Sequence, residues 1–216
     1  MARLPRLVLP GHAHLVVQRA QGARPVFADE SDRRRYLDTL REAAAAERVA
    51  VHAFALADDA VWLLLTPPEP ASLGRFVQSL GRRYVSAYNR RHAQRGTLWD
   101  GRYRCGLVET GAPRLAALRF VDGQPGLTSA AHRVGGERST WLVDLPEYWS
   151  LGNTPFDREA AYRTLLVQGL PPADAEALHA AARGGWAWGS AGFAADVAAA
   201  AGRPPTPRPR GRPRRA

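Results

Sequence analysis

The chain of 216 residues contains no lysine, a single cysteine and no long apolar run. One cysteine, Cys105, excludes an intramolecular disulfide and a zinc site built from several cysteines. No stretch approaches the ~20 apolar residues of a membrane helix. Pro5 and Pro10 interrupt the N-terminal segment, which lacks the apolar core of a secretory signal. We therefore expect a soluble, cytoplasmic protein that does not contact a membrane.

The charge is strongly positive. A net charge of +10 arises from 30 basic residues, all of them arginine. The planar guanidinium group matches phosphate and guanine, so this excess indicates a polyanionic partner. A GC-rich genome would also favour arginine over lysine, so the inference rests on the sign and clustering of the charge. Apolar residues make up 45% of the chain, enough for one core with an appendage.

The first half of the chain alternates between predicted strands and helices. Strands are expected at 15–19, 49–57 and 60–66, with Asp58 and Asp59 in the turn between the last two. Serines at 31 and 72 are typical of helix starts, and each precedes an amphipathic stretch. This order predicts an α+β fold, an antiparallel sheet with helices packed on one face.

The second half is predicted to be more helical. Residues 128–149 are rich in loop-forming residues, which we interpret as a relaxed constraint on the sequence of this segment. Asp157 and Ser190 are expected to cap helices, with another helix over 173–183 between them. The tail lacks large apolar side chains and should be disordered on its own. The expected organisation is a domain at 1–127, an irregular connection at 128–152, a helical extension at 153–201 and an arginine-rich tail at 202–216.

Three stretches carry a resemblance to a known family. Residues 4–44 resemble an opening strand, an arginine-bearing turn and a first helix, and residues 51–70 resemble a strand pair with a His-hydrophobic-His motif. Residues 73–110 resemble a long helix followed by a tryptophan-containing hairpin. In this order the chain is similar to the REP-associated tyrosine transposases, single-tyrosine members of the HUH nucleases that act on single-stranded DNA. The resemblance implies a ferredoxin-like core and continues into the C-terminal helices.

The positions that carry chemistry in this family differ here. The two histidines of the motif fall on Ala60 and Trp62, and the nucleophilic tyrosine falls on Phe120. Alanine has no donor atom, the indole nitrogen is only a hydrogen-bond donor, and a phenyl ring offers no oxygen nucleophile. Active relatives use a divalent metal such as Mg or Mn. In this chain we expect no catalytic residue, no metal and no cofactor.

Two substitutes for the lost groups need weighing. Tyr84 and Tyr88 lie four residues apart on one helix face and are fallback nucleophiles. They also continue an apolar stripe from position 73, which favours a place in the core. His12 and His14 form a possible replacement metal pair, but no carboxylate accompanies them in the sequence, and a site needs a full ligand set.

The candidate DNA-binding surface combines basic and aromatic side chains, as single-strand binding requires. Its members are Arg82, Arg83, Asn89, Arg90, Arg91, Trp99, Arg102, Arg104, Arg210, Gly211 and Arg212. The last three belong to residues 209–213, which resemble an AT-hook for a narrow minor groove. A plain basic arm that neutralises phosphates is the alternative.

The leading hypothesis is a protein that recognises hairpin or single-stranded DNA without cutting it. The alternatives are an active metal-dependent nickase or transposase that uses another tyrosine, and an RNA-binding or scaffold protein. The sequence leaves open the choice between DNA and RNA and the oligomeric state.

Overall fold

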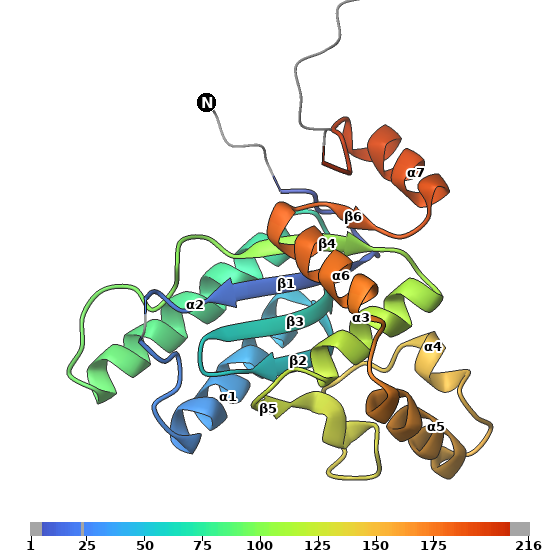
Figure 1. Ribbon diagram of the computed structural model, residues 1–216. Helices are drawn as coiled ribbons and strands as arrows, with labels where there is room; N and C mark the ends of the chain where they lie inside the picture. The colour runs from blue at the N-terminus through green and yellow to red at the C-terminus, as the bar shows by residue number, and fades with distance from the viewer. Residues whose placement is uncertain (1–5, 23, 208–216) are drawn as a thin grey trace, which may run out of the picture.

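The computed structural model describes residues 6–22 and 24–207, which form one six-stranded sheet with helices around it (Figure 1). The strand order is β5-β2-β3-β1-β4-β6. The strands are β1 (Ala13–Arg19), β2 (Ala50–Leu56), β3 (Ala60–Thr66), β4 (Arg104–Val108), β5 (Leu127–Thr128) and β6 (Ala187–Trp188). The helices are α1 (Glu30–Glu47), α2 (Ser72–Arg91), α3 (Ala112–Asp122), α4 (Pro146–Trp149), α5 (Pro155–Gln168), α6 (Pro172–Gly184) and α7 (Ala191–Ala201), with a 3-10 turn η1 (Ser129–His132).

The first six elements follow the order β1-α1-β2-β3-α2-β4. In the sheet, β1 lies between β3 and β4 and is antiparallel to both. This is the ferredoxin-like arrangement that the sequence predicted, so the α+β fold class is confirmed.

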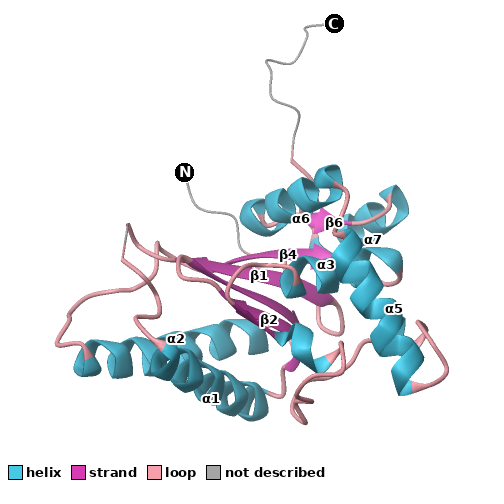
Figure 2. Ribbon diagram, turned by 60° about the horizontal axis from the view of Figure 1, so that its bottom comes forward, coloured by secondary structure: helices cyan, strands magenta, loops and turns pink. Residues whose placement is uncertain are grey.

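Helices cover both faces of the sheet (Figure 2). Successive side chains of a strand point to opposite faces. Val61 and Leu63 of β3 therefore join the core under α1 and α2, which we call the first face. Trp62 and Leu64 join a second core with α3 and α6, which we call the second face. The sequence predicted helices on one face only. That expectation holds for α1 and α2, but it missed the second layer.

The first two helices begin near their predicted positions. The Asp29 side chain caps α1 by accepting a hydrogen bond of 3.1 Å from the Asp32 backbone N–H. The predicted cap, Ser31, lies inside the first turn instead. Aspartate and serine are both good N-caps, so sequence alone did not separate them. Helix α2 begins at Ser72, as predicted.

The C-terminal helices α5, α6 and α7 lie close to their predicted positions. Thr154, and not the predicted Asp157, caps α5; the Asp157 carboxylate accepts a hydrogen bond from the Thr154 N–H, which completes a capping box. Ser190 caps α7 as predicted, accepting a hydrogen bond of 3.1 Å from the Phe193 N–H.

The connection after β5 is irregular but tightly packed. Arg133 has 0% of its surface exposed and forms an ion pair of 2.9 Å with Asp122 of α3. Tyr162 of α5 donates to the same carboxylate oxygen at 2.7 Å. This segment is therefore fixed to α3 and α5 through a buried ion pair, because a buried charge must stay paired.

Helix α6 lies directly on β4. A Cβ atom added to Gly106 of β4 would come within 2.8 Å of the Ala181 carbonyl carbon. Only glycine permits this approach of the helix backbone to the strand. The chain then continues into β6, which pairs parallel to β4.

The start of the predicted disordered tail contacts the sheet edge. The Ala187 N–H of β6 donates to the Pro205 carbonyl at 2.7 Å, and the Arg203 guanidinium donates to the Gly185 carbonyl at 2.8 Å. The Arg203 side chain and the Pro205 carbonyl thus contact residues at β6, and the expected disorder of the tail stays a prediction. The remainder, 208–216, lies outside the described residues, together with the AT-hook-like segment.

Candidate functional site

The three positions assigned to the family's chemistry lie together on the second face. Trp62 of β3 and Phe120 of α3 meet edge to face, with ring centroids 5.1 Å apart and an interplanar angle of 81°. Their exposed fractions are 5% and 8%. Ala60 lies two residues before Trp62, on the same face and also buried. Trp62 and Phe120, 58 positions apart in sequence (120 − 62) and separated by α2, are therefore neighbours in space, as one site requires.

The chemistry of this site is apolar. The His179 ring lies 5.4 Å from the Trp62 ring, and burial lowers the pKa of this histidine. Alanine, tryptophan and phenylalanine offer no lone pair to a hard divalent ion. Within residues 6–22 and 24–207, no three His, Cys, Asp or Glu side chains gather in a way that could hold a metal. The donor set therefore does not fit the metal that active relatives use.

The histidines near the start of β1 do not form a substitute site. His14 is buried; its Nε2 atom accepts from the Leu9 N–H at 3.3 Å, and its Nδ1 atom bonds the His12 carbonyl at 2.8 Å. Burial lowers the pKa of His14 to about 4. Both ring nitrogens are occupied, so His14 is a neutral core residue.

The fallback tyrosines belong to the core of the first face. Tyr84 is 0% exposed, and its hydroxyl donates to the Val26 carbonyl at 2.6 Å. Tyr88 donates to the Pro25 carbonyl at 3.3 Å. Burial raises the pKa of Tyr84 well above its ordinary value. The prediction that this stripe is core is confirmed, and the sheet separates both phenols from Trp62 and Phe120.

Several candidate DNA-binding residues of α2 bond other parts of the protein. Arg83 pairs with Glu42 of α1, and Arg91 pairs with the buried carboxylate of Asp32 at 2.6 Å. Asn89 donates to the Gly96 carbonyl at 2.8 Å. These contacts connect α2 to α1, and they connect α2 to the loop that follows α2. Arg82 and Arg90 of the same helix are exposed.

Trp99 lies in the core rather than on the surface. It is 6% exposed and packs with the first-face cluster, and its indole N–H has no hydrogen-bond partner within the described chain. A buried ring offers no face to a nucleic-acid base, so the expected stacking role of Trp99 is wrong for this conformation.

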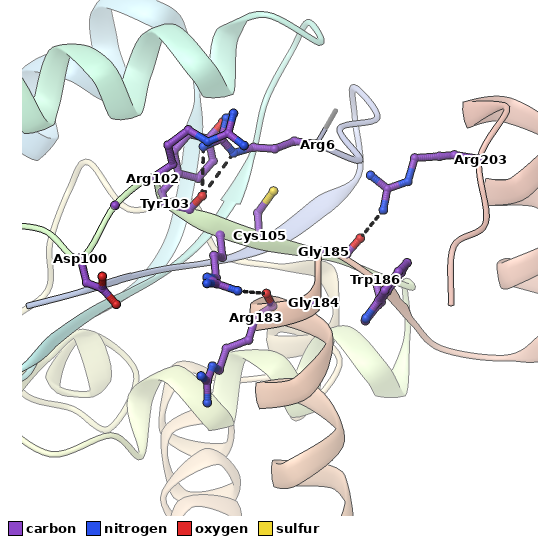
Figure 3. A pocket seen from close by; sticks show the side chains of 12 residues that line it. Arg6, Asp100, Arg102, Tyr103, Cys105, Arg183, Gly184, Gly185, Trp186 and Arg203 are labelled. Atoms are coloured by element: carbon purple, nitrogen blue, oxygen red, sulfur yellow. Dashed lines mark hydrogen bonds between the residues drawn. The ribbon is translucent and has the colours of Figure 1, made fainter. Parts of the chain in front are cut away.

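The two remaining candidates of the described chain, Arg102 and Arg104, line an open groove (Figure 3). Its volume is about 400 Å³. We call it the arginine groove, and its defining residues are Arg6, Arg102, Arg104, Arg183, Trp186 and Arg203. It lies between the strand entry at β4, the C-terminal end of α6 and the segment before α7 (Figure 3). The candidates Arg210, Gly211 and Arg212 lie outside the described residues.

Sequence reasoning missed four of these residues, Arg6, Arg183, Trp186 and Arg203. They come from segments far apart in the chain, and no local pattern links them. The only signal was the general excess of arginine, which does not single out positions.

A family model for IS200-like transposases matches residues 9–124, more than half of the chain. The chain belongs to the IS200-like transposase family. The family prediction made from the sequence is confirmed. The match runs from just before β1 to just after α3, and so includes Ala60, Trp62 and Phe120.

Two solved structures resemble this fold at low sequence identity. The structure of a REP-associated tyrosine transposase bound to a REP hairpin aligns at 9% identity with a TM-score of 0.48, covering 56% of this chain and 70% of that one. A protein from Deinococcus radiodurans R1, described as a candidate transposase, aligns at 23% identity with a TM-score of 0.39, covering 50% of this chain and 88% of that one. Comparison with curated proteins gives no match. No helix within the described part of this transposase-family chain is long and apolar enough to cross a membrane.

Proposed function

We propose that this protein recognises hairpin or single-stranded DNA and does not cut it. The observation that carries the proposal is the contact between Trp62 and Phe120, 5.1 Å between ring centroids. At the positions that the resemblance assigns to a metal ligand and to the nucleophile, two apolar rings fill the space against each other. Phosphodiester attack needs an oxygen nucleophile, and neither ring provides one.

Binding is supported by family membership together with charge. The chain belongs to a transposase family and carries a net charge of +10. The arginine groove is lined by five arginines and one carboxylate, Asp100. Guanidinium groups bind phosphate oxygens through several N–H donors at once.

An active enzyme that uses Tyr84 or Tyr88 is less well supported. Each phenol is buried and donates its proton to a backbone carbonyl. A raised pKa makes the Tyr84 phenolate harder to form, whereas a nucleophile needs the opposite shift. Attack would therefore require α2 to leave the first-face core.

The test combines a native and a denaturing gel. The purified protein is incubated with end-labelled single-stranded DNA that contains a hairpin, with magnesium or manganese present. We expect a shifted complex that weakens as salt rises, and neither a cleaved strand nor a protein-linked band.

A protein-linked band would overturn the proposal of silent recognition, and Tyr84→Phe and Tyr88→Phe variants would then locate the nucleophile. A shift with an RNA hairpin but not with its DNA counterpart would instead support the RNA-binding alternative. Salt-insensitive capture of a protein partner with no nucleic-acid shift would support the scaffold alternative.

A further inference from the structure

We propose that the arginine groove binds the phosphate backbone of an extended, unpaired DNA strand. This inference rests on the proposed DNA-binding function and assigns that function to a place and a form of DNA. The sequence predicted a DNA-binding surface centred on α2, whereas the arginine groove lies at the junction of β4 and α6.

The two surfaces differ in how many of their arginines are paired with a carboxylate; on α2, only the exposed Arg82 and Arg90 lack an ion pair within the described residues. On α2, Arg83 and Arg91 are neutralised by carboxylates of α1 and the residue before it. In the groove, the guanidinium groups of Arg6, Arg102 and Arg104, like that of Arg183, form no ion pair with any carboxylate of the described residues. Positive charge that the protein leaves uncompensated in a hollow attracts anions most strongly.

Three of the groove arginines are held in place by the backbone, Arg203 through the Gly185 carbonyl and the other two through further carbonyls. Arg104 donates to the Arg183 carbonyl at 3.0 Å, and Arg6 donates twice to the Tyr103 carbonyl, at 3.1 and 3.2 Å. A guanidinium group has five N–H donors, so each retains donors for a ligand. Side chains that are already ordered lose less entropy when a phosphate binds.

The Arg104 contact also has a purely structural reading. Its guanidinium lies at the C-terminal end of α6, where a cation stabilises the helix dipole. This reading extends to Arg183, which lies in the last turn of α6, but not to Arg102. Both are exposed, and their guanidinium groups make no hydrogen bond within the described chain. These two residues therefore test ligand binding with the least effect on folding.

The shape of the groove favours a single strand. Its volume of about 400 Å³ is that of a small-molecule site. We infer from this volume that the groove takes part of one extended strand rather than a whole duplex. Trp186 on the groove wall is only partly buried and packs its indole against Gly184. The Arg203 guanidinium lies 5.7 Å from the centroid of this ring, and an aromatic ring among arginines is the combination that binds unpaired nucleotides.

The experiment compares two double variants with the unmodified protein. Arg102→Gln with Arg183→Gln removes two charges from the groove. Arg34→Gln with Arg41→Gln removes two exposed charges from α1, on the first face, and is the matched control. The probes are a labelled oligothymidylate of roughly 15 nucleotides, a blunt DNA hairpin and an oligouridylate of the same length as the oligothymidylate. Fluorescence anisotropy gives each affinity over a range of salt, and circular dichroism checks folding.

We expect the groove variant to bind oligothymidylate about tenfold more weakly, with a salt slope lower by about 1.4, since each lost phosphate contact on a single strand removes about 0.7. The control should retain both values, and binding of the blunt hairpin should change equally little in both variants. Equal loss in groove and control variants would overturn the groove assignment while leaving DNA binding intact. Tighter groove-dependent binding of oligouridylate would overturn the assignment to DNA. Failure of the unmodified protein to bind either DNA probe would instead reject the proposed function.

Discussion

The Tyr162 hydroxyl donates a hydrogen bond of 2.7 Å to the Oδ2 atom of Asp122. The same oxygen accepts from Arg133 at 2.9 Å, and the other carboxylate oxygen accepts from the Ser129 hydroxyl at 2.5 Å. Helices α3 and α5 and the irregular connection are thereby joined through one buried carboxylate. Several hydrogen bonds to one charge offset the cost of removing it from water.

Asp122→Asn should therefore destabilise the protein strongly. The substitution leaves the buried Arg133 charge with only the more distant carboxylate of Asp144, at 3.7 Å, and we expect a loss of about 3–5 kcal/mol in the free energy of unfolding. Urea denaturation followed by circular dichroism measures it. Asp38→Asn on the exposed side of α1 is the control and should stay within about 0.5 kcal/mol. Similar values for both variants would show that the buried pair contributes little.

The buried histidines predict a loss of stability in mild acid. Burial lowers the pKa of His14 and His52 to about 4 in the folded protein, below the ordinary value of 6.5. The unfolded chain therefore takes up protons first, and stability falls as the pH drops from 6.5 towards 4. Each histidine should cost about 1.4 kcal/mol per pH unit in this window.

His52→Gln tests this pH dependence because glutamine can still bond Thr66 and the Val143 carbonyl, the two partners of His52. Between pH 6.5 and 5 the unmodified protein should lose about 2 kcal/mol more than the variant. Urea unfolding at a series of pH values gives both curves. Parallel curves would mean that His52 is protonated equally in the folded and unfolded states.

Gly106→Ala should loosen the junction between β4 and α6. The new methyl group would lie 2.8–2.9 Å from backbone atoms of Ala181 and Ala182, so the helix must shift. We expect a destabilisation of about 1–3 kcal/mol, together with weaker binding of single-stranded DNA, because α6 carries one wall of the arginine groove. Gly192→Ala in α7 is the control, because the new Cβ would meet only the Ser190 Oγ atom, at an ordinary contact distance of 3.8 Å. Normal stability and affinity in Gly106→Ala would refute the tight fit.

Phe120→Tyr returns a hydroxyl to the nucleophile position without restoring the chemistry. The ring remains packed against Trp62, and positions 60 and 62 still lack metal ligands. We expect no covalent adduct with hairpin DNA in magnesium or manganese on a denaturing gel. An adduct from this single variant would show that the site holds a metal through other groups.

The strands and the first-face helices could be predicted because their signals are local. The apolar run at 60–66 is β3 to the residue, and the stripe that contains Leu73, Phe76 and Tyr84 is the buried side of α2. The same run also indicated burial on both faces, since an antiparallel strand with one wet face alternates polar and apolar residues. That signal pointed to the missing layer of α3 and α6.

The binding surface was harder to predict because it depends on distant partners. Arg83 and Arg91 have the same local appearance as Arg82 and Arg90, and only the packing of α1 against α2 shows which ones meet a carboxylate. Trp99 follows a basic helix as a stacking residue would, yet it turns into the core. Arg102 and Arg183 come together only when α6 lies on β4.

The parallel strand β6 also covers an edge of the sheet that could otherwise pair with another copy of the chain. It accepts the outward N–H groups of Leu107 and Glu109, each at 3.0 Å, which would otherwise form an open edge on β4. On the outer side of β6, the Ala187 N–H donates a hydrogen bond to the Pro205 carbonyl. The neighbouring Pro204 and Pro207 have no N–H to donate. Open strand edges recruit further chains into a growing sheet, and prolines stop that growth. The segment 203–207, which contributes Arg203 to the arginine groove, thus also hinders edge-to-edge aggregation at β6.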